Sequence, residues 1–371
     1  MTDVAETSMV TGFPRFVARR LAAKLLERPE ENQRVFLLVR KTFIAAANEF
    51  LAGLDANTRE RLRIVEGDVG DMDLGLAGGE YKALGSELTA IYHLAELQPC
   101  DAKREQFERV NVEGTRTVLE LATEIPKLRR LIHFSSAHVA GTRTGVILEE
   151  ELDERQRFYD LFEETKFQAE RLVQGAARRL PITILRPSTI VGDSRSGQID
   201  RFDGPYYLLV LIVTSPIDVH LPLPVRGDVP LNLVPIDFVV DAAAALSRDA
   251  RAQGGTFHLC DPSPFSARSV YRLAALRADR KPPRGVIPTG LARVFLSVPG
   301  IERVARAPLS LITALHHFAV YNCRNTLALL ENTTVRCPPI DAYIDKLVHY
   351  IRQVHAEKRE RLEEEAYDPF D

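Results

Sequence analysis

The sequence contains few cysteines, and their spacing excludes two kinds of site. Only four occur among the 371 residues, at Cys100, Cys260, Cys323 and Cys337. No two of them form a C-x-x-C pair, and no histidine pair stands at ligand spacing nearby. We therefore expect neither a zinc site nor a disulfide framework, and no metal of any kind. Reduced thiols of this kind are typical of a cytoplasmic protein.

Long apolar runs and a surplus of basic charge are missing as well. The longest apolar stretch, residues 206–213, is well short of the ~20 residues that a membrane span requires. Residues 1–6 show no basic region followed by an apolar core, so we expect no secretory signal. The net charge of -3 argues against a surface devoted to nucleic-acid phosphates. We expect a cytoplasmic protein with no membrane span and no nucleic-acid partner.

What the first half does contain is a regular alternation of short apolar runs and longer helical periods. The runs are uniformly apolar, as in strands buried on both faces of a parallel sheet. This alternation predicts an α/β fold, a doubly wound parallel sheet. Strands are expected at 8–11, 35–39, 62–65, 90–95, 131–135 and 182–185, and helices near 16–26, 42–54, 104–123 and 163–177.

The second half predicts a smaller lobe beside this sheet. A strand at 232–234, a helix at 237–246 and a strand at 256–259 are expected to return to the sheet. We therefore assign residues 1–190 plus roughly 231–262 to the sheet domain, and roughly 191–230 and 263–371 to a C-terminal lobe. The charged segment 343–365 has apolar positions on one face and no sustained heptads, so it is expected to pack on the body.

The turn after the first strand has features of a dinucleotide-binding loop. Gly12 supplies the residue for the tight turn, and Ala18 is small enough for close helix–strand packing. Arg15 occupies the place between them, where a small residue usually lets the backbone approach a pyrophosphate. The helix that follows presents its N-terminus, which attracts anions. We predict that Arg15 supplies a cation to a cofactor phosphate; the alternative is that it crowds the loop.

Two further strand ends bear on the choice of cofactor. The second strand ends in Arg40 and Lys41, where proteins that prefer NAD carry an acidic residue for the ribose hydroxyls. Cations at this place suit the extra phosphate of NADP, although an exposed basic turn is an alternative. After the third strand, Asp68 of Gly67-Asp68-Val69 is placed to accept a hydrogen bond from an adenine amino group. The predicted cofactor is NADP(H).

Several motifs, in a fixed order along most of the chain, resemble the extended short-chain dehydrogenase/reductase family. They are the loop at Gly12, GDV at 67–69, YHLA at 92–95, NVEGT at 111–115, SSAHVAG at 135–141 and LRPS at 185–188. Three more, LGL at 74–76, FDGPY at 202–206 and CPP at 337–339, look most like the thioester-reductase and fatty-acyl reductase branch, whose NAD-binding domain is of the male-sterility type.

The resemblance implies hydride transfer to or from a nicotinamide. In the family a tyrosine hydroxyl transfers the proton, a lysine four residues later lowers its pKa and holds the cofactor ribose, and a serine or threonine orients the substrate oxygen. Residues at this spacing share one helical face. Ser136 matches the serine, Lys166 matches the lysine, and Asn111 matches a position associated with a proton relay through water. Phe162 stands at the tyrosine position and lacks the hydroxyl.

The missing hydroxyl leaves three interpretations open, since losing a general acid typically costs about 10²–10⁴ in rate. The chain could be a natural variant that uses Tyr159, His138 or water. It could be a catalytically impaired NADPH-binding or sensor protein, or an engineered Tyr-to-Phe variant of an active enzyme. Tyr159 lies seven residues before Lys166, so it could substitute only if the segment before Glu163 were not helical.

The predicted function is NADPH-dependent reduction of a carbonyl or acyl-thioester substrate. The substrate is expected to be a small molecule or an acyl group bound to a carrier, and the C-terminal lobe is expected to bind it. Departure of a thiolate demands less acid catalysis than ketone reduction, which is a hypothesis for how Phe162 is tolerated. Alternative functions are a nucleotide-sugar epimerase or dehydratase and a hydroxysteroid-type dehydrogenase. A homodimer is one oligomeric state compatible with the sequence. The residues expected to contact the cofactor are Thr11, Gly12, Phe13, Pro14, Arg15, Phe16, Val17, Arg40, Lys41, Asp68, Val69, Leu94, Ala95, Lys166, Pro187 and Ser188.

Other polar residues are expected to have structural roles. Asp237 is interpreted as a helix N-cap. His93 is expected to line the cofactor cleft through its backbone, and His138 to pack. The pair His316-His317 has no third ligand nearby and is interpreted as structural.

Overall fold

The computed structural model describes residues 6–27, 33–98, 102–202, 204, 206–215, 220, 227–285 and 318–366. The main sheet consists of β1 (Thr7–Phe13), β2 (Arg34–Val39), β3 (Leu62–Glu66), β4 (Ala90–His93), β5 (Arg130–Phe134), β7 (Ile182–Pro187) and β10 (Thr256–Leu259). These strands lie in the order β10-β7-β5-β4-β1-β2-β3, and every pair is parallel. The predicted doubly wound parallel sheet is confirmed.

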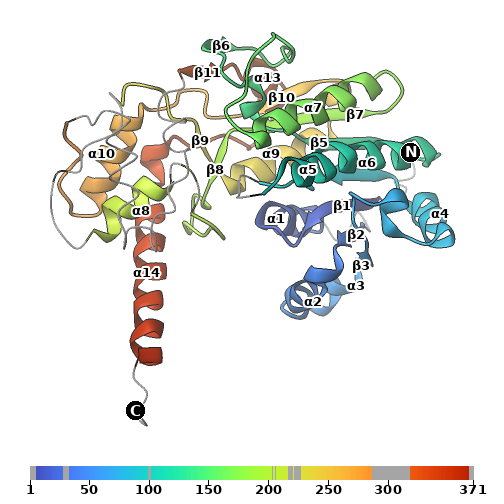
Figure 1. Cartoon of the computed structure of the whole chain (residues 1–371), viewed down its shortest axis with the longest axis horizontal. Helices are drawn as coiled ribbons and strands as arrows, with labels where there is room; N and C mark the ends of the chain where they lie inside the picture. Colours follow the sequence, from blue (N-terminus) through green and yellow to red (C-terminus); the bar gives the residue numbers. More distant parts are fainter. Residues whose placement is uncertain are drawn as a thin grey trace.

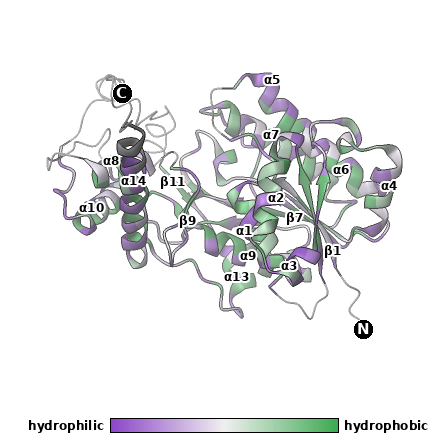
Figure 2. Cartoon of the chain, turned by 90° about the horizontal axis from the view of Figure 1, so that it is seen from below, coloured by the Kyte–Doolittle hydropathy of each residue, from purple (hydrophilic) through white to green (hydrophobic). Residues whose placement is uncertain are grey.

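Helices cover both faces of this sheet. One layer contains α1 (Phe16–Leu25), α2 (Ile44–Ala52), α9 (Ile236–Arg248) and α13 (Arg324–Leu330); the other contains α4 (Gly78–Glu87), α6 (Gly114–Glu124) and α7 (Leu161–Ala176). In β1, Met9 packs with the second layer and Val10 with the first, and neither is exposed. Because successive side chains point to opposite faces, both must be apolar, and Figure 2 shows the sheet enclosed between the two layers.

The remaining elements connect the sheet to the lobe or lie at its margins. The helical ones are α3 (Ala56–Glu60), α5 (Arg104–Phe107), the π-helical η4 (Glu108–Glu113), α8 (Tyr206–Thr214), α10 (Ala267–Arg277), α14 (Ile344–Ala366) and the short 3₁₀ turns η2 (Lys41–Phe43), η3 (Met72–Gly75), η5 (Ala137–Ala140), η6 (Ala250–Ala252) and η7 (Ile340–Ala342). The short strands are β6 (Gly145–Ile147), β8 (Thr189–Val191), β9 (Leu233–Pro235) and β11 (Ala319–Tyr321).

A second hydrophobic cluster lies beside the sheet and is built by α8, α10 and α14 (Figure 1). Tyr206, Tyr271 and Leu347 are among its buried members. The apolar stretch 206–213 is thus a helix of this cluster rather than a membrane segment. No described helix has both the length and the apolar character that a membrane crossing requires.

Two expectations about the segment 232–246 are wrong. The strand β9 does not join the main sheet: it pairs with β8, with Thr189 opposite Leu233, because the chain leaves the main sheet after β7. Of the described strands that follow β7, only β10 returns, beside β7 itself. Asp237 is not an N-cap, since α9 begins at Ile236 after Pro235. Its carboxylate accepts hydrogen bonds from the backbone and hydroxyl of Ser194, at 2.8 and 2.6 Å, and so holds the loop that follows β8.

Candidate active site

A cavity of about 730 Å³ lies at the carboxyl ends of the central strands, as expected for a doubly wound sheet. It extends from the turn after β1 to the loops that lead into α8. Residues far apart in the chain meet there: Gly12 and Arg15, then Ser136, then Phe162 and Glu163 from the start of α7. The cavity therefore joins the predicted cofactor loop to two of the predicted catalytic positions, Ser136 and Phe162.

The turn after β1 approaches β4 so closely that only glycine fits at residue 12. Gly12 has a φ of +83°, and a Cβ there would lie 2.7 Å from the carbonyl oxygen of Leu94. Thr11 fixes this approach, because its hydroxyl accepts hydrogen bonds from the amides of Leu94 and Ala95, both at 3.0 Å. The amide of Arg15 closes the turn by donating to the carbonyl of Gly12 at 3.1 Å.

The N-terminus of α1 faces the cavity, and the carboxylate of Asp200, which also lines the cavity, accepts a hydrogen bond from the amide of Phe16 there. Arg15 is the N-cap residue, its side chain makes no capping hydrogen bond, and the first turn contains no acidic residue. The cavity is lined by residues 12–18. The first amides of a helix attract anions, so this turn fits the pyrophosphate of a dinucleotide, and the side chain of Arg15 lines the same space.

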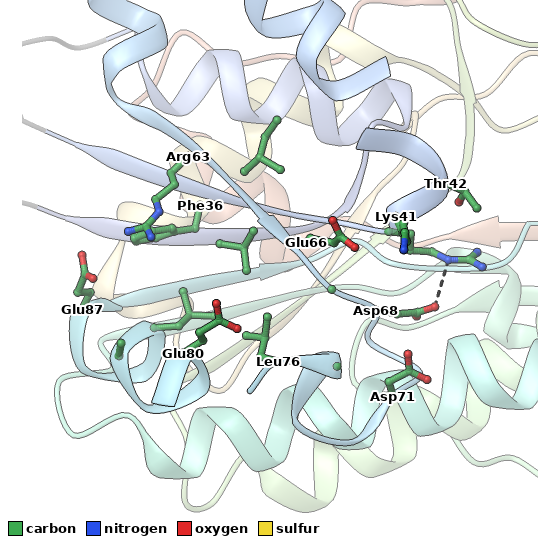
Figure 3. Close-up of a pocket in the computed structure, with 17 residues that line it drawn as sticks. Phe36, Lys41, Thr42, Arg63, Glu66, Asp68, Asp71, Leu76, Glu80 and Glu87 are labelled. Carbon is green, nitrogen blue, oxygen red and sulfur yellow. Dashed lines mark ion pairs between the residues drawn. The ribbon is translucent and has the colours of Figure 1, made fainter. Parts of the chain in front are cut away.

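At the far end of the turn, a second pocket of about 730 Å³ lies along β3, and it shares Arg40, Gly67 and Asp68 with the main cavity (Figure 3). The Asp68 carboxylate forms two ion pairs there. The same carboxylate oxygen lies 3.1 Å from the guanidinium of Arg40 and 3.4 Å from that of Arg109. Its other oxygen accepts from the amide of Gly70 at 2.9 Å. Lys41 lies exposed at the mouth of this pocket. The two predicted cations are thus adjacent, and one of them is paired with the predicted adenine-binding carboxylate.

The predicted catalytic residues surround the end of β5. Ser136 is buried, lines the cavity and caps η5, its hydroxyl accepting from the amide of His138 at 3.1 Å. The ammonium of Lys166 donates to the carbonyl of Phe134 at 2.6 Å and pairs with Glu96 at 3.0 Å. Phe162 lies one helical turn before Lys166 and lines the cavity.

Asn111 lies in the π-helical segment η4 and is almost fully buried. Its side-chain carbonyl accepts from the amide of Leu97 at 2.6 Å, and its amide donates to the hydroxyl of Thr165 at 2.9 Å. Asn111 therefore ties the loop after β4 to α7, one residue from Lys166. A π-bulge at this place is typical of functional sites.

The start of α7 places two more residues at the cavity: Tyr159, which the sequence suggested as a substitute for the missing tyrosine, and Glu163, which the sequence did not assign to the site. The helix begins at Leu161 with Asp160 as its N-cap, so Tyr159 lies outside it and lines the cavity while remaining 43% exposed. Glu163 also lines the cavity, is buried, and accepts a hydrogen bond from the amide of Tyr159 at 2.9 Å. Burial raises the pKa of the Glu163 carboxyl to about 8, an effect reinforced by the charge of Asp160.

Glu96, the partner of Lys166, is the other residue missed; it comes directly after Leu94 and Ala95, beyond the end of β4. The sequence feature that could have indicated Glu96 is a carboxylate just after a strand whose carboxyl end is expected to face the cofactor. The feature that could have indicated Glu163 is a carboxylate directly after Phe162, the residue that replaces the family's tyrosine.

Behind the cavity, Pro187 and Ser188 line the wall, whereas Arg186 is buried beneath them. The guanidinium of Arg186 pairs with Glu170 at 2.6 Å and donates to the carbonyls of Glu149 and Glu151. Glu170 also accepts a short hydrogen bond from the hydroxyl of Ser135. This buried ion pair joins β7 to α7 behind the residue that precedes Ser136.

The histidines near the site differ in their surroundings. His93 is buried between the hydroxyls of Thr11 and Thr115, at 2.9 and 3.0 Å. Burial and, to a lesser extent, the charge of Lys166 lower the pKa of His93 to about 3, so it is neutral. His138 lines the cavity, with one ring nitrogen 3.4 Å from the hydroxyl of Thr189. The pair His316-His317 lies outside the described residues.

The fold and the cavity together define a class, the nucleotide-binding α/β oxidoreductases of the extended short-chain dehydrogenase/reductase type. The chain belongs to the NAD-binding family described as "Male sterility protein", whose family model matches residues 10–243. The match contains the turn at Gly12, Ser136, Phe162 and Lys166, and it confirms the resemblance to the thioester-reductase branch.

Within the aligned regions, curated relatives are identical to this chain at about a quarter of the positions. A linear gramicidin synthase of Brevibacillus parabrevis is 26% identical over 91% of this chain and 7% of its own length. Fatty acyl-CoA reductase wat of Drosophila melanogaster is 27% identical over 65% of this chain and 53% of its own length. The chain thus spans a small part of the first relative and about half of the second.

Among solved structures, the terminal R domain from the myxalamid PKS-NRPS biosynthetic pathway superposes with a TM-score of 0.79 and 28% identity, covering 96% of this chain and 92% of that domain. UDP-glucuronic acid 4-epimerase from Bacillus cereus, in complex with NAD, superposes with a TM-score of 0.66 and 17% identity, covering 94% of this chain and 99% of the epimerase. The second likeness concerns the fold alone.

Proposed function

We propose that this chain is an NADPH-dependent reductase that reduces an acyl thioester, or the corresponding carbonyl compound, by hydride transfer. The observation that carries the proposal is the cavity in which the turn at Gly12 and the N-terminus of α1 meet Ser136 and the start of α7. When bound, the nicotinamide supplies the hydride, and the residues of the chain bind, orient and exchange protons with the substrate.

The preference for NADPH rests on the cations at the end of β2. Arg40 and Lys41 are both exposed beside the pocket that β3 borders, and Thr42 adds a hydroxyl at the same mouth (Figure 3). A ribose phosphate at this place would meet the ammonium of Lys41, the guanidinium of Arg40 and the hydroxyl of Thr42. Asp68, the nearby acid, is already held by Arg40.

A thioester substrate is supported by the relatives and by Phe162. The gramicidin synthase, the fatty acyl-CoA reductase and the R domain named above are relatives that cover much of this chain at 26 to 28% identity. A thiolate leaves without needing a proton, so the first reduction depends less on an acid than the reduction of an aldehyde does. Ser136 would hold the carbonyl oxygen, and the substrate would be small or bound to a carrier.

A cofactor-binding protein without efficient turnover is the second candidate, since Phe162 lacks the hydroxyl and Glu96 occupies Lys166. An epimerase of the same fold is disfavoured by Lys41, because such enzymes retain NAD; absorbance of tightly bound NAD in the purified protein would favour it.

The deciding experiment titrates the protein with NADPH and NADH and then mixes it with NADPH and acyl-thioesters of increasing chain length in single turnover. We expect tighter NADPH binding and cofactor oxidation with at least one thioester. No oxidation with any of them contradicts the reductase proposal and favours the second candidate.

A further inference from the structure

The cavity lacks a hydroxyl at position 162 but contains a carboxyl at the next position. Phe162 and Glu163 both lie in the first turn of α7 and both line the cavity. Glu163 is 8% exposed, whereas its neighbour Glu164 reaches outward to pair with the exposed Arg104 at 2.8 Å. One of two adjacent carboxylates therefore faces the site and the other faces solvent.

Four residues with titratable side chains lie around the Glu163 carboxyl or line the cavity beside it. The carboxylate of Asp160, the N-cap residue of α7, accepts a hydrogen bond from the backbone amide of Glu163 at 2.9 Å. Tyr159 donates its backbone amide to one carboxyl oxygen, and Tyr321 of β11 lines the same cavity and interacts electrostatically with Glu163. His138 of η5 lines the same space. The acid thus lines the same cavity as Ser136, together with residues of the loop before α7, of β11 and of η5.

This environment keeps the carboxyl protonated at neutral pH. Burial disfavours the charged form, and the negative charge of Asp160 disfavours it further; together they outweigh the hydrogen bond from Tyr159 and raise the pKa of Glu163 to about 8. A tyrosine titrates near ~10 and needs a neighbouring ammonium to act at neutral pH. A carboxylic acid whose pKa is close to the working pH is suited to donate a proton.

We propose that Glu163 is a catalytic residue that donates a proton to the carbonyl oxygen of the substrate, in place of the hydroxyl that Phe162 lacks. The proposal rests on the reductase function above and names the acid for it. Ser136 orients the oxygen, and Glu163 protonates it as the hydride adds to the carbonyl carbon. The electron pair of the C=O π bond forms the new O–H bond.

The steps balance for a thioester. The first product is a hemithioacetal and a Glu163 carboxylate. The carboxylate then takes back the hydroxyl proton as the C=O bond re-forms and the C–S bond breaks, and the departing thiolate takes a proton from water. Thioester, hydride donor and one proton give aldehyde and thiol. Reduction of that aldehyde to an alcohol consumes the Glu163 proton, which solvent must replace, so the second reduction depends more on the acid.

The test compares Glu163→Gln with Glu164→Gln in the intact chain. Both replace a carboxyl group by an amide in the same helical turn, and glutamine retains an oxygen for the amide of Tyr159. We expect Glu163→Gln to lower kcat for an aldehyde by about 10²–10⁴ and for a thioester by less, with little change in KM. Glu164→Gln should remain near the parent. In the parent the rate should fall as pH rises through about 8, since the protonated form is the donor, and this fall should be absent in Glu163→Gln.

A measurement without cofactor provides an independent readout. Infrared difference spectra of the parent at neutral and alkaline pH should show a protonated carboxyl that titrates, and Glu163→Gln should lack it. Adding Phe162→Tyr to Glu163→Gln should restore aldehyde reduction, because the hydroxyl returns beside Lys166.

The outcomes separate this proposal from the function on which it rests. If the parent oxidises NADPH with a thioester or aldehyde, yet Glu163→Gln keeps kcat within about threefold and the same pH profile, Glu163 is not the acid, although the reductase function stands. Should the carboxyl titrate in the infrared while no substrate is reduced by the parent, the reductase function fails and the catalytic role of Glu163 fails with it. Loss of activity in Glu163→Gln that Phe162→Tyr does not restore, with an unchanged pH profile, would indicate a structural role and overturn the proposal.

Discussion

Lys166 and Glu96 form an ion pair of 3.0 Å between α7 and the loop after β4, and the lysine side chain is only 3% exposed. The same ammonium donates to the carbonyl of Phe134 at 2.6 Å. Lys166 is the residue that the family resemblance assigns to the cofactor ribose. In this structure its charge is already satisfied by the chain, so a bound cofactor has to compete with Glu96.

We therefore predict that Glu96→Gln tightens NADPH binding. An exposed ion pair is typically worth about 0–1 kcal/mol, and this pair is screened less because its side chains are only 3% and 19% exposed, so the dissociation constant should fall by about fivefold or more. NADPH fluorescence titration measures it. Glu113→Gln is a matched control, since it breaks an exposed pair of the same 3.0 Å length with Arg116 and should leave binding unchanged. Weaker binding in Glu96→Gln would mean that Glu96 itself holds the cofactor.

A second prediction concerns the close approach at Gly12. Gly12→Ala and Gly145→Ala both place a side chain at a positive φ, +83° and +85°, which alone costs about 1–2 kcal/mol. Only at Gly12 would the new Cβ also collide with a backbone, at 2.7 Å from Leu94; nothing lies within 4 Å of the other. Urea unfolding should show the larger loss for Gly12→Ala, and NADPH binding should be lost in that variant alone. Equal effects of the two substitutions would contradict the close-approach explanation.

A third prediction concerns the buried pair behind the site. Arg186 and Glu170 are 1% and 0% exposed, so Arg186→Met leaves a buried carboxylate unpaired and should cost about 3–5 kcal/mol of unfolding free energy. The exposed pair Arg104–Glu164 supplies the control: Arg104→Met should cost about 0–1 kcal/mol. Adding Glu170→Met to Arg186→Met should recover part of the loss. If Arg186→Met and Arg104→Met unfold at the same urea concentration, the buried pair stabilises the fold no more than the exposed pair, and the prediction is wrong.

A fourth prediction separates the two ends of the pocket beside β3. Lys41 lies at its mouth, whereas Arg63 lies at the other end over the ring of Phe36, 5.6 Å from its centroid (Figure 3). Lys41→Ala should weaken NADPH binding by about tenfold, the loss of one charge-assisted contact, with little effect on NADH. Arg63→Ala removes the same charge and should affect neither. Equal loss for NADPH and NADH in Lys41→Ala would contradict a contact with the ribose phosphate.

The sheet and its cofactor turn could be predicted from local patterns. Uniformly apolar runs indicate strands buried on both faces, and β1, β2 and β7 lie within a few residues of their expected places. Gly12 followed by a helix indicates a tight turn wherever it occurs. These features depend on neighbours in the chain, and periodicity and turn chemistry report such neighbours directly.

What the sequence could not decide are the pairings between distant elements. Residues 232–234 have the composition of a sheet strand, yet β9 pairs with β8 because the chain leaves the main sheet after β7. Asp237 has the character of a cap, yet it holds Ser194, 43 residues away in the chain. Glu96 meets Lys166 and Glu163 faces the cavity only once α7 packs against η4, η5 and α6. The protonation of a carboxyl depends on the water removed from around it, and only the packed structure determines how much water remains.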